Sequence, residues 1–217
     1  MEKYIKNEGS GIFVQLGAGA GDLDPRANYN DGFTNFIKKL PLESIKKLVL
    51  VEPNPINIPI LKQCWKDYSI VEIHQMAITT SEHNETTAKF YFTDNDGPHY
   101  QIGSLLRTHN ENSRYRGQKV NEINVNVETI NSFLENRVGT EIELLAIDIE
   151  GMDIPVLLEI DFNKFKIKYL SFEHLGFKRQ SEQKKIIFDH LQNNNFEFYG
   201  NGCDHNGYDY LFRNKFN

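Results

Sequence analysis

The chain has 217 residues, 39% of them hydrophobic and 25% charged, and its formal net charge is −6. This length and composition predict a globular protein and exclude a disordered chain. The acidic balance argues against nucleic-acid and membrane partners, because both attract basic surfaces. The N-terminal stretch is polar and no apolar run is long enough to span a bilayer, so we expect a cytoplasmic protein.

Short apolar runs alternate with amphipathic stretches through most of the chain. Residues 11–16 form an apolar run that ends in glycines, and residues 31–40 place apolar side chains at helical spacing. Further strands are predicted, in chain order, at residues 47–52, 70–75, 143–149, 168–173, 196–199 and 208–212. Further helices are predicted after Asn54 as N-cap, at residues 155–159 after Asp153 as N-cap, and at residues 180–193. In the last of these, the side chains expected to face inward are Ile186, Ile187, Phe188 and Leu191. This alternation predicts an α/β fold with a mostly parallel sheet, whose ligands bind beyond the carboxyl ends of the strands.

The pattern changes between about residues 78 and 143, where we expect an insert within a single domain of residues 1–217. Residues 88–93 and 120–127 alternate as strands do, and the polar stretch 94–119 between them is predicted to be a loop. A short helix is predicted at residues 129–134.

The predicted loop of the insert is rich in polar and aromatic side chains. Tyr100, Ser104 and Arg107 are the ones we expect to hydrogen-bond or stack on a polar, sugar-like substrate. The loop also contains His99, His109, Arg114, Tyr115 and Arg116. A solvated loop without a ligand is the alternative interpretation.

Three alternating glycines follow the first predicted strand, and an acid ends the second. Gly17, Gly19 and Gly21 let the backbone turn tightly and let a ligand approach, although a turn without a ligand has the same pattern. Glu52 could accept hydrogen bonds from both hydroxyls of a ribose. Together these features indicate an adenosine-containing ligand.

The spacing around this loop separates two adenosine-containing cofactors. A dinucleotide fingerprint has the pattern GxGxxG, whereas this chain has GxGxG followed by Asp22, which would repel a pyrophosphate and suit an ammonium group. Glu52 also comes 31 positions after Gly21, whereas the dinucleotide pattern places its acid about 20 positions further on. S-adenosylmethionine is therefore favoured over a nicotinamide cofactor.

Acids also follow the strands predicted at residues 143–149 and 168–173. Asp148 and Glu150 follow apolar residues, and a carboxylate that emerges from a dry core is costly unless it has a task. Glu173 and His174 stand side by side and could supply a general base or metal ligands. A turn with a surface Glu and His is the alternative.

These residues together resemble the FkbM family of S-adenosylmethionine-dependent methyltransferases. The resemblance is carried by LGAGAG (16–21), VEPNP (51–55), QMAI (75–78), GSL (103–105), LLAIDIEGMDIPVL (144–157) and SFEH (171–174). It implies a Rossmann-like class I methyltransferase fold, with a seven-stranded, mostly parallel sheet that has a final antiparallel strand. O-methylation of a hydroxyl on a small-molecule or glycan acceptor is the chemistry that it implies.

The resemblance also implies roles for individual residues. The glycine loop would wrap the methionine part of the cofactor, Glu52 would hold the ribose, Met76 and Ala77 would lie near the adenine, and Asp148 near the sulfonium. The residues predicted to bind the cofactor are Gln15, Gly17, Ala18, Gly19, Gly21, Asp22, Asp31, Glu52, Asn54, Met76, Ala77 and Asp148.

The chain departs from the family pattern at three of these motifs. Gln15 stands where the family often has aspartate, Gly19 where it often has asparagine, and Asp153 where it often has glutamate. Asp22 or Asp31 could replace the missing contact to the amino group of the methionine part.

Two mechanisms for activating an acceptor hydroxyl remain open. In the first, His174 or Asp148 is the base, and Glu150 and Glu173 orient the substrate. In the second, Asp148 and Glu173 bind a divalent cation such as magnesium, which lowers the pKa of the acceptor.

Two other classes of function also remain open. One is a NAD-dependent oxidoreductase, and the other is a non-catalytic domain that retains the cofactor fold. The sequence does not indicate an oligomeric state.

Overall fold

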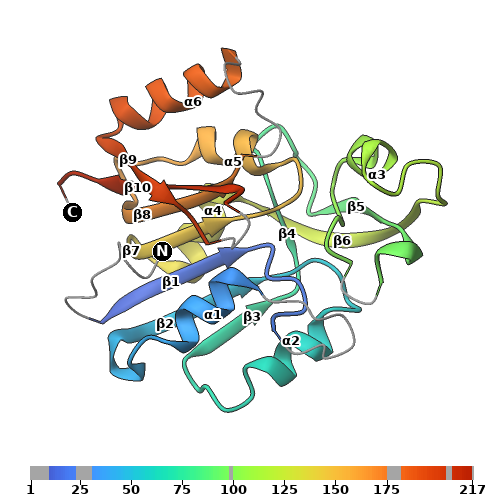
Figure 1. The fold of residues 1–217 in the computed structure, drawn as a ribbon, viewed down its shortest axis with the longest axis horizontal. Helices are drawn as coiled ribbons and strands as arrows, with labels where there is room; N and C mark the ends of the chain where they lie inside the picture. Colours follow the sequence, from blue (N-terminus) through green and yellow to red (C-terminus); the bar gives the residue numbers. More distant parts are fainter. Residues whose placement is uncertain (1–9, 23–30, 98–99, 175–181, 204–206, 217) are drawn as a thin grey trace.

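The computed structural model describes residues 10–22, 31–97, 100–174, 182–203 and 207–216. Within them a seven-stranded sheet has the order β3-β2-β1-β7-β8-β10-β9 (Figure 1). Its strands are β1 (Gly11–Leu16), β2 (Ile45–Val51), β3 (Val71–His74), β7 (Glu141–Ile147), β8 (Lys166–Glu173), β9 (Phe196–Asn201) and β10 (Asp209–Asn214). β1, β2, β3, β7 and β8 pair in parallel, whereas β10 is antiparallel to both β8 and β9. The predicted Rossmann-like sheet with a final antiparallel strand is therefore confirmed.

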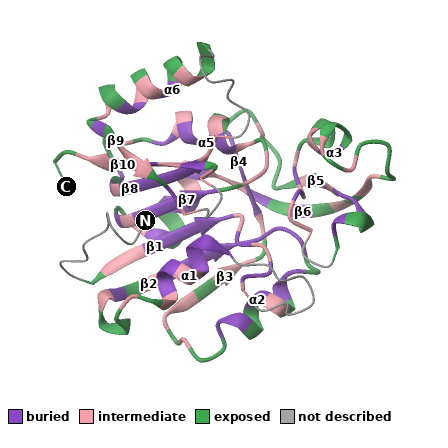
Figure 2. Ribbon diagram, viewed as in Figure 1, coloured by how far each residue is buried: buried purple, intermediate pink, exposed green. Residues whose placement is uncertain are grey.

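Helices cover both faces of this sheet, because its central strands are apolar on both sides. On one face, α1 (Gly32–Lys38) and α2 (Ile58–Cys64) pack against side chains such as Phe13 and Leu48. On the other, α4 (Ile130–Phe133), α5 (Asp153–Glu159) and α6 (Glu182–Asn193) pack against side chains such as Val14 and Leu145. Figure 2 shows the buried residues concentrated in the central strands.

A second, three-stranded sheet lies beside the main one and forms the insert. Its order is β4-β6-β5, with β4 (Ala77–Thr79) parallel and β5 (Thr87–Phe92) antiparallel to β6 (Asn121–Thr129). The short helix α3 (Arg107–Asn112) packs on β5. Figure 1 shows β5, β6 and α3 projecting to one side of the main sheet. The insert strands run from residue 77 to residue 129, whereas the sequence placed the insert at about 78–143.

Four local predictions need correction, and the first concerns α2. The helix begins at Ile58 with Asn57 as N-cap, not after Asn54, because Pro59 fits only the first turn. The Asn54 side chain instead accepts the backbone N–H of Ile56 in the preceding turn.

The second and third corrections concern short elements. The stretch 94–119 is not all loop, since it contains a 3₁₀ helix at Asp94–Asp96 and helix α3. Only Asn110 is buried in α3, so this helix has no apolar stripe for the sequence to show. Strand β4 has three residues and was not predicted.

The last correction concerns α6, whose first predicted residues, 180–181, lie outside the described part of the chain. Ile187 and Leu191 are buried as predicted, whereas Ile186 is 52% exposed. None of the helices in the described ranges is long and apolar enough to cross a membrane.

Candidate active site

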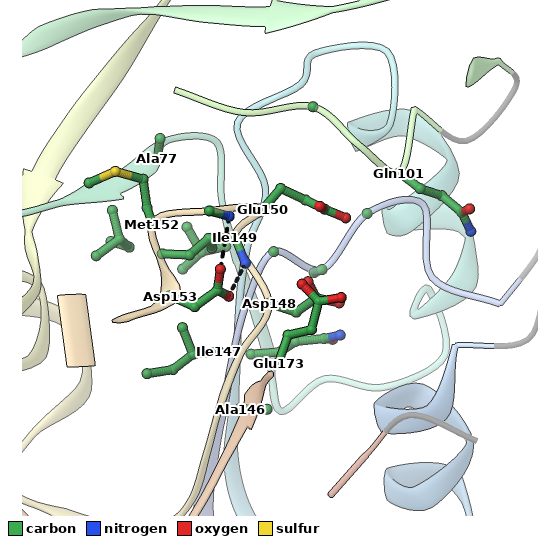
Figure 3. Close-up of a pocket in the computed structure, with 18 of the residues that line it drawn as sticks. Ala77, Gln101, Ala146, Ile147, Asp148, Ile149, Glu150, Met152, Asp153 and Glu173 are labelled. Atoms are coloured by element: carbon green, nitrogen blue, oxygen red, sulfur yellow. Dashed lines mark hydrogen bonds between the residues drawn. The ribbon is translucent and has the colours of Figure 1, made fainter. Parts of the chain in front are cut away.

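A cavity of about 890 Å³ opens at the carboxyl ends of β1, β2, β7 and β8 (Figure 3). These strands point the same way, so their last residues meet at one edge of the sheet. The walls of the cavity also include residues of the insert, of β4 and of α6. Ligand pockets usually measure about 300–1,000 Å³, so the space is large for one small ligand.

The glycine loop is fixed by backbone contacts to both neighbouring strand ends. The N–H groups of Gly17 and Ala18 donate to the carbonyl of Val51, and the N–H of Asp148 donates to the carbonyl of Leu16. Gly17 has φ +84°, and a Cβ there would lie 1.6 Å from the carbonyl oxygen of Asp148. Only glycine therefore allows the loop to lie this close to the end of β7.

The next glycine of the loop faces open space. A Cβ on Gly19 would meet no atom within 4 Å, and Gly19 lines the cavity. A ligand can approach the backbone here without meeting a side chain.

Glu52 is buried at the end of β2 and stabilises this loop. One carboxylate oxygen accepts the N–H of Gly19 at 2.8 Å, and the other accepts the N–H of Asn54 at 2.8 Å and the side-chain amide of Asn57 at 3.3 Å. Burial raises the pKa of Glu52 to about 7, although the two backbone N–H groups oppose the shift. Glu52 lines the cavity, and the oxygen that accepts the N–H of Gly19 can accept one further hydrogen bond.

Gln15 and Asp31 form a buried polar pair at the cavity wall. The amide nitrogen of Gln15 donates to Asp31 at 3.2 Å, and Asp31 caps α1 by accepting the N–H of Thr34 at 2.6 Å. Burial raises the pKa of Asp31. The amide oxygen of Gln15 is buried and has no hydrogen-bond partner among the described residues. Because a buried polar atom without a partner is costly, this oxygen is a candidate contact for a ligand that donates a hydrogen bond.

Asp148 follows β7, is exposed and lines the cavity. Enclosure by the cavity walls, followed by the charges of Glu150, Asp153 and Glu173, raises the pKa of Asp148 well above its ordinary value. The repulsion among these carboxylates would be relieved by a cationic ligand.

Asp153 is not the N-cap of α5, which is Met152, but the first residue of the helix. Its buried carboxylate reaches back to accept the N–H groups of Ile149 and Gly151, at 2.8 and 2.9 Å. Burial raises its pKa to about 6, and these two hydrogen bonds oppose the shift. Asp153 therefore fixes the loop that carries Asp148 and Glu150.

Glu173 and His174 line the cavity at the end of β8. The His174 ring stacks on Tyr210 with centroids 3.7 Å apart, and its Nε2 lies 3.3 Å from the carbonyl of Gly207. Asp209 of β10 lies opposite Glu173 in the antiparallel register and also lines the cavity.

The structure brings most of the predicted site residues to this one cavity. Those that line it are Gln15, Gly17, Ala18, Gly19, Asp31, Glu52, Met76, Ala77, Tyr100, Asp148, Glu150, Glu173 and His174.

Three residues predicted to bind the cofactor do not line the cavity. A Cβ on Gly21 would lie 3.0 Å from the sulfur of Cys64, and the N–H of Asp22 lies 3.4 Å from the same sulfur. Asn54 contacts Glu52 through its backbone N–H. Gly21, Asp22 and Asn54 do not line the cavity.

Two residues predicted to bind substrate also do not line it. Ser104 is buried and donates to the backbone carbonyl of Glu150 at 2.6 Å. Arg107 is exposed and pairs with Glu111 at 2.8 Å. His99 lies outside the described residues.

Several residues that line the cavity were not predicted from the sequence, among them Gln101, Tyr208 and Asp209. Gln101 lies in the stretch predicted as loop. A polar side chain in a loop is usually exposed to solvent, so the sequence gives no signal that this one lines a cavity. Tyr208 precedes the antiparallel strand β10 and Asp209 begins it, so the rule that the ends of parallel strands form the site did not include them.

The described part of the chain contains no group of three or more His, Cys, Asp or Glu side chains placed to hold a metal ion. Asp148 and Glu173 alone would leave most of the six positions that magnesium requires to water or substrate. The magnesium hypothesis thus gains no support and remains a prediction.

The strand order and the cavity at the strand ends define a class I methyltransferase fold. The family model of the methyltransferase FkbM domain matches residues 15–198, and the chain belongs to this family. No curated protein matches the chain.

Solved structures are similar at low sequence identity. A methyltransferase FkbM from Methylobacillus flagellatus is 13% identical with a TM-score of 0.47, covering 94% of this chain, which spans 43% of that protein. Aeropyrum pernix fibrillarin with bound S-adenosyl-L-methionine is 10% identical with a TM-score of 0.47, covering 96% of this chain and 67% of that one. A putative RNA methyltransferase from Pyrococcus horikoshii is 10% identical with a TM-score of 0.44, covering 95% of this chain and 75% of that one.

Proposed function

We propose that this protein transfers a methyl group from S-adenosylmethionine to the oxygen of a hydroxyl on a small-molecule or sugar-containing acceptor. The observation that carries the proposal is the meeting of the open Gly19 backbone, the unpartnered oxygen of Gln15 and the crowded carboxylate of Asp148 in one cavity. The backbone at Gly19 leaves room for a ligand to approach, and the Gln15 oxygen can accept a hydrogen bond from an ammonium group. The carboxylate of Asp148 favours a ligand that carries positive charge.

The residues present fit this cofactor better than a dinucleotide. Gln15 and Asp31 would hold the ammonium group, Glu52 the ribose hydroxyls, and Met76 and Ala77 would line the adenine side. A pyrophosphate would instead add negative charge to a cavity that already contains several carboxylates, which argues against the oxidoreductase alternative.

S-adenosylmethionine, when bound, supplies a methyl group activated by a sulfonium. The chain must align the acceptor, exclude water and take up the proton of the hydroxyl. We assign proton uptake to Asp148, because its raised pKa makes the carboxylate a stronger base. Glu173 and His174 lie at the neighbouring strand end and would orient the acceptor. His174 is the less suitable base, because its ring is stacked on Tyr210.

Calorimetric titration tests cofactor choice. We expect S-adenosylhomocysteine to bind the wild-type protein and NAD not to bind. Glu52→Gln should weaken that binding by about tenfold or more, because an amide cannot accept both backbone N–H groups. Glu43→Gln, an exposed site before β2, is the matched control and should bind like wild type. Binding of NAD in place of S-adenosylhomocysteine would overturn the proposal.

The reaction is tested by following the labelled methyl group of S-adenosylmethionine into a defined mixture of monosaccharides and phenols. We expect O-methyl products, whereas methylation at nitrogen or carbon only would contradict the proposed chemistry. Turnover that is unchanged in EDTA would exclude the magnesium version, and loss of turnover that magnesium restores would favour it.

A further inference from the structure

Glu150 has a backbone conformation that its side chain does not favour. Its φ is +52°, in the left-handed region that non-glycine residues rarely occupy. The N–H groups of the residues on either side, Ile149 and Gly151, are held by Asp153. Such a conformation persists where the surroundings fix it, and it is common at functional sites.

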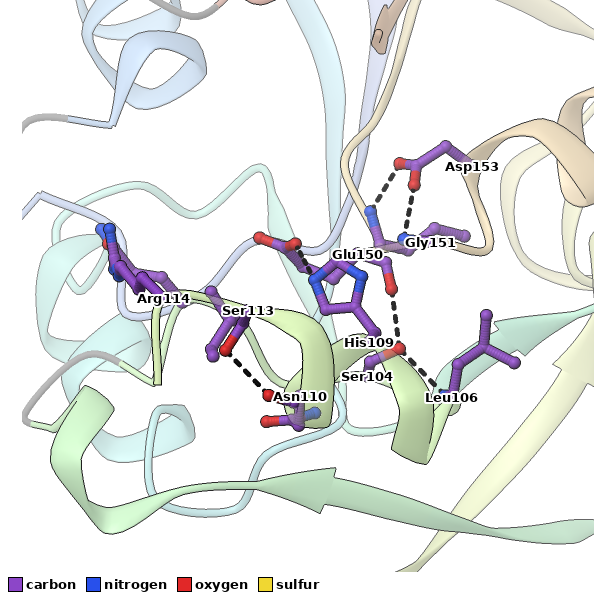
Figure 4. Close-up of polar contacts among 12 residues, drawn as sticks. Ser104, Leu106, His109, Asn110, Ser113, Arg114, Glu150, Gly151 and Asp153 are labelled. Atoms are coloured by element: carbon purple, nitrogen blue, oxygen red, sulfur yellow. Dashed lines mark hydrogen bonds and ion pairs between the residues drawn. The ribbon is translucent and has the colours of Figure 1, made fainter. Parts of the chain in front are cut away.

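The insert supplies the contacts that hold Glu150 from the other side (Figure 4). Ser104 donates its hydroxyl to the backbone carbonyl of Glu150 at 2.6 Å. His109, on α3, places Nε2 2.8 Å from one carboxylate oxygen of Glu150. Both main chain and side chain of this residue are therefore anchored by the insert, more than 40 positions away in the sequence.

The ion pair leaves half of the Glu150 carboxylate available. Among the described residues, nothing donates a hydrogen bond to its second oxygen. Glu150 and His109 both line the cavity, and Figure 3 shows the Glu150 carboxylate on the same side as Gln101. The second oxygen can thus accept a hydrogen bond from a ligand in the cavity.

We propose that His109 is a positioning residue that acts through Glu150. It holds the Glu150 carboxylate against the insert, so that the second oxygen binds a hydrogen-bond donor on the methyl acceptor. The acceptor class that follows is a molecule with at least two donor groups, one methylated and one bound by Glu150, such as a diol or an amino alcohol. The role rests on the proposed methyl transfer, although the ion pair can be tested without it.

The charges around His109 agree with a protonated ring. The hydrogen bond to Glu150 raises the pKa of His109, burial opposes this, and the charge of Asp153 adds to the increase. Glu150 lies in the loop before α5 and Asp153 is the first residue of α5, whereas Arg114 lies on the insert side and lines the same cavity.

Three variants separate charge from hydrogen bonding. His109→Gln keeps a donor to Glu150 without a charge, and His109→Leu removes both. His83→Gln is the matched control, because His83 lies on the insert near β5 and its ring nitrogen contacts the backbone carbonyl of Thr87. Neither His109 nor His83 is among the proposed cofactor contacts.

Two measurements test the positioning directly. By NMR titration, the His109 pKa should lie above its ordinary value in wild type and fall in Glu150→Gln, because the hydrogen bond to Glu150 is the main cause of the increase. By hydrogen exchange, amides of residues 148–153 should exchange about tenfold faster in His109→Leu and less than about threefold faster in His109→Gln. An unshifted His109 pKa in Glu150→Gln, or exchange in His109→Leu equal to that of His83→Gln, would overturn the proposal.

The role in acceptor binding is tested with the same mixture of monosaccharides and phenols. His109→Leu should raise the acceptor concentration for half-maximal labelling by about tenfold, with S-adenosylhomocysteine binding unchanged. An unchanged half-maximal concentration would refute the acceptor role of the pair. If the wild-type protein does not bind S-adenosylhomocysteine, the proposed function fails, and the NMR and exchange results still decide whether His109 positions Glu150.

Discussion

The cavity has two walls that are held together in different ways. The wall at the ends of β1, β2 and β7 is fixed by backbone hydrogen bonds between neighbouring strands, such as that from Asp148 to Leu16. The wall formed by the insert meets the same cavity through side chains, chiefly Ser104 and His109 on Glu150. The backbone contacts depend on the hydrogen bonds between neighbouring strands and on a glycine at position 17. The side-chain contacts, in contrast, can be altered by substitution without a change of fold.

The two walls therefore differ in the ligand that we assign to each. The cofactor is the constant partner of a methyltransferase family, and its proposed contacts lie on the rigid strand ends. The acceptor is the variable partner, and the wall assigned to it is an insert attached by a few side chains. A family can therefore change the acceptor wall while keeping the cofactor wall.

The largest expected effect comes from Gly17→Ala, which disrupts the wall at the ends of β1, β2 and β7. The added Cβ would lie 1.6 Å from the carbonyl oxygen of Asp148, so β1 and β7 could not keep their spacing. We expect a loss of more than about 4 kcal/mol in the free energy of unfolding, or no folded protein at all. Gly117→Ala is a close control, because Gly117 has the same φ of +84° and nothing within 4 Å. It should cost only about 1–2 kcal/mol, and similar losses in urea denaturation of both variants would contradict the backbone argument.

The next effect is a pH dependence of stability that comes from Glu52. Its pKa is raised from 4.5 to about 7, so the folded state binds a proton more tightly than the unfolded chain. The stabilisation is complete below pH 4.5 and is lost as pH rises through 7, by about 3 kcal/mol at about 1.36 kcal/mol per pKa unit. Urea denaturation at a series of pH values should show this component in wild type and not in Glu52→Gln. Equal slopes in the two proteins between pH 4.5 and 7 would count against it.

A smaller effect is expected from Ser104→Ala, which removes one of the side-chain contacts of the wall formed by the insert. The hydroxyl donates to the Glu150 carbonyl and accepts the N–H of Leu106, so its removal leaves two partly buried groups without these partners. We expect a loss of about 1–3 kcal/mol, with binding of S-adenosylhomocysteine unchanged. Thermal unfolding and calorimetry measure the two quantities, and weakened cofactor binding would show that the walls are not separate.

The smallest effect is expected from Arg107→Ala. Its guanidinium is exposed, pairs with Glu111 and lies outside the cavity wall. The melting temperature and the acceptor concentration for half-maximal labelling should both stay at their wild-type values. A clear rise in that concentration would restore the substrate-binding role that the sequence predicted for Arg107.

The sequence by itself determined the main sheet and the strand ends to which we assign the cofactor. Apolar runs and the residues that follow them are local features, and parallel strands bring those residues to one edge. Gly17, Glu52 and Asp148 could be predicted for this reason, and the FkbM pattern contains all three.

Only the tertiary structure decided the acceptor side. The contact between His109 and Glu150 joins residues 41 positions apart, and no periodicity relates α3 to the end of β7. The start of α2 and the short β4 depended likewise on packing and pairing, which local sequence does not encode. Asp22 and Arg107 carry charges that look suitable for a ligand, and it is their orientation in space that places them outside the wall.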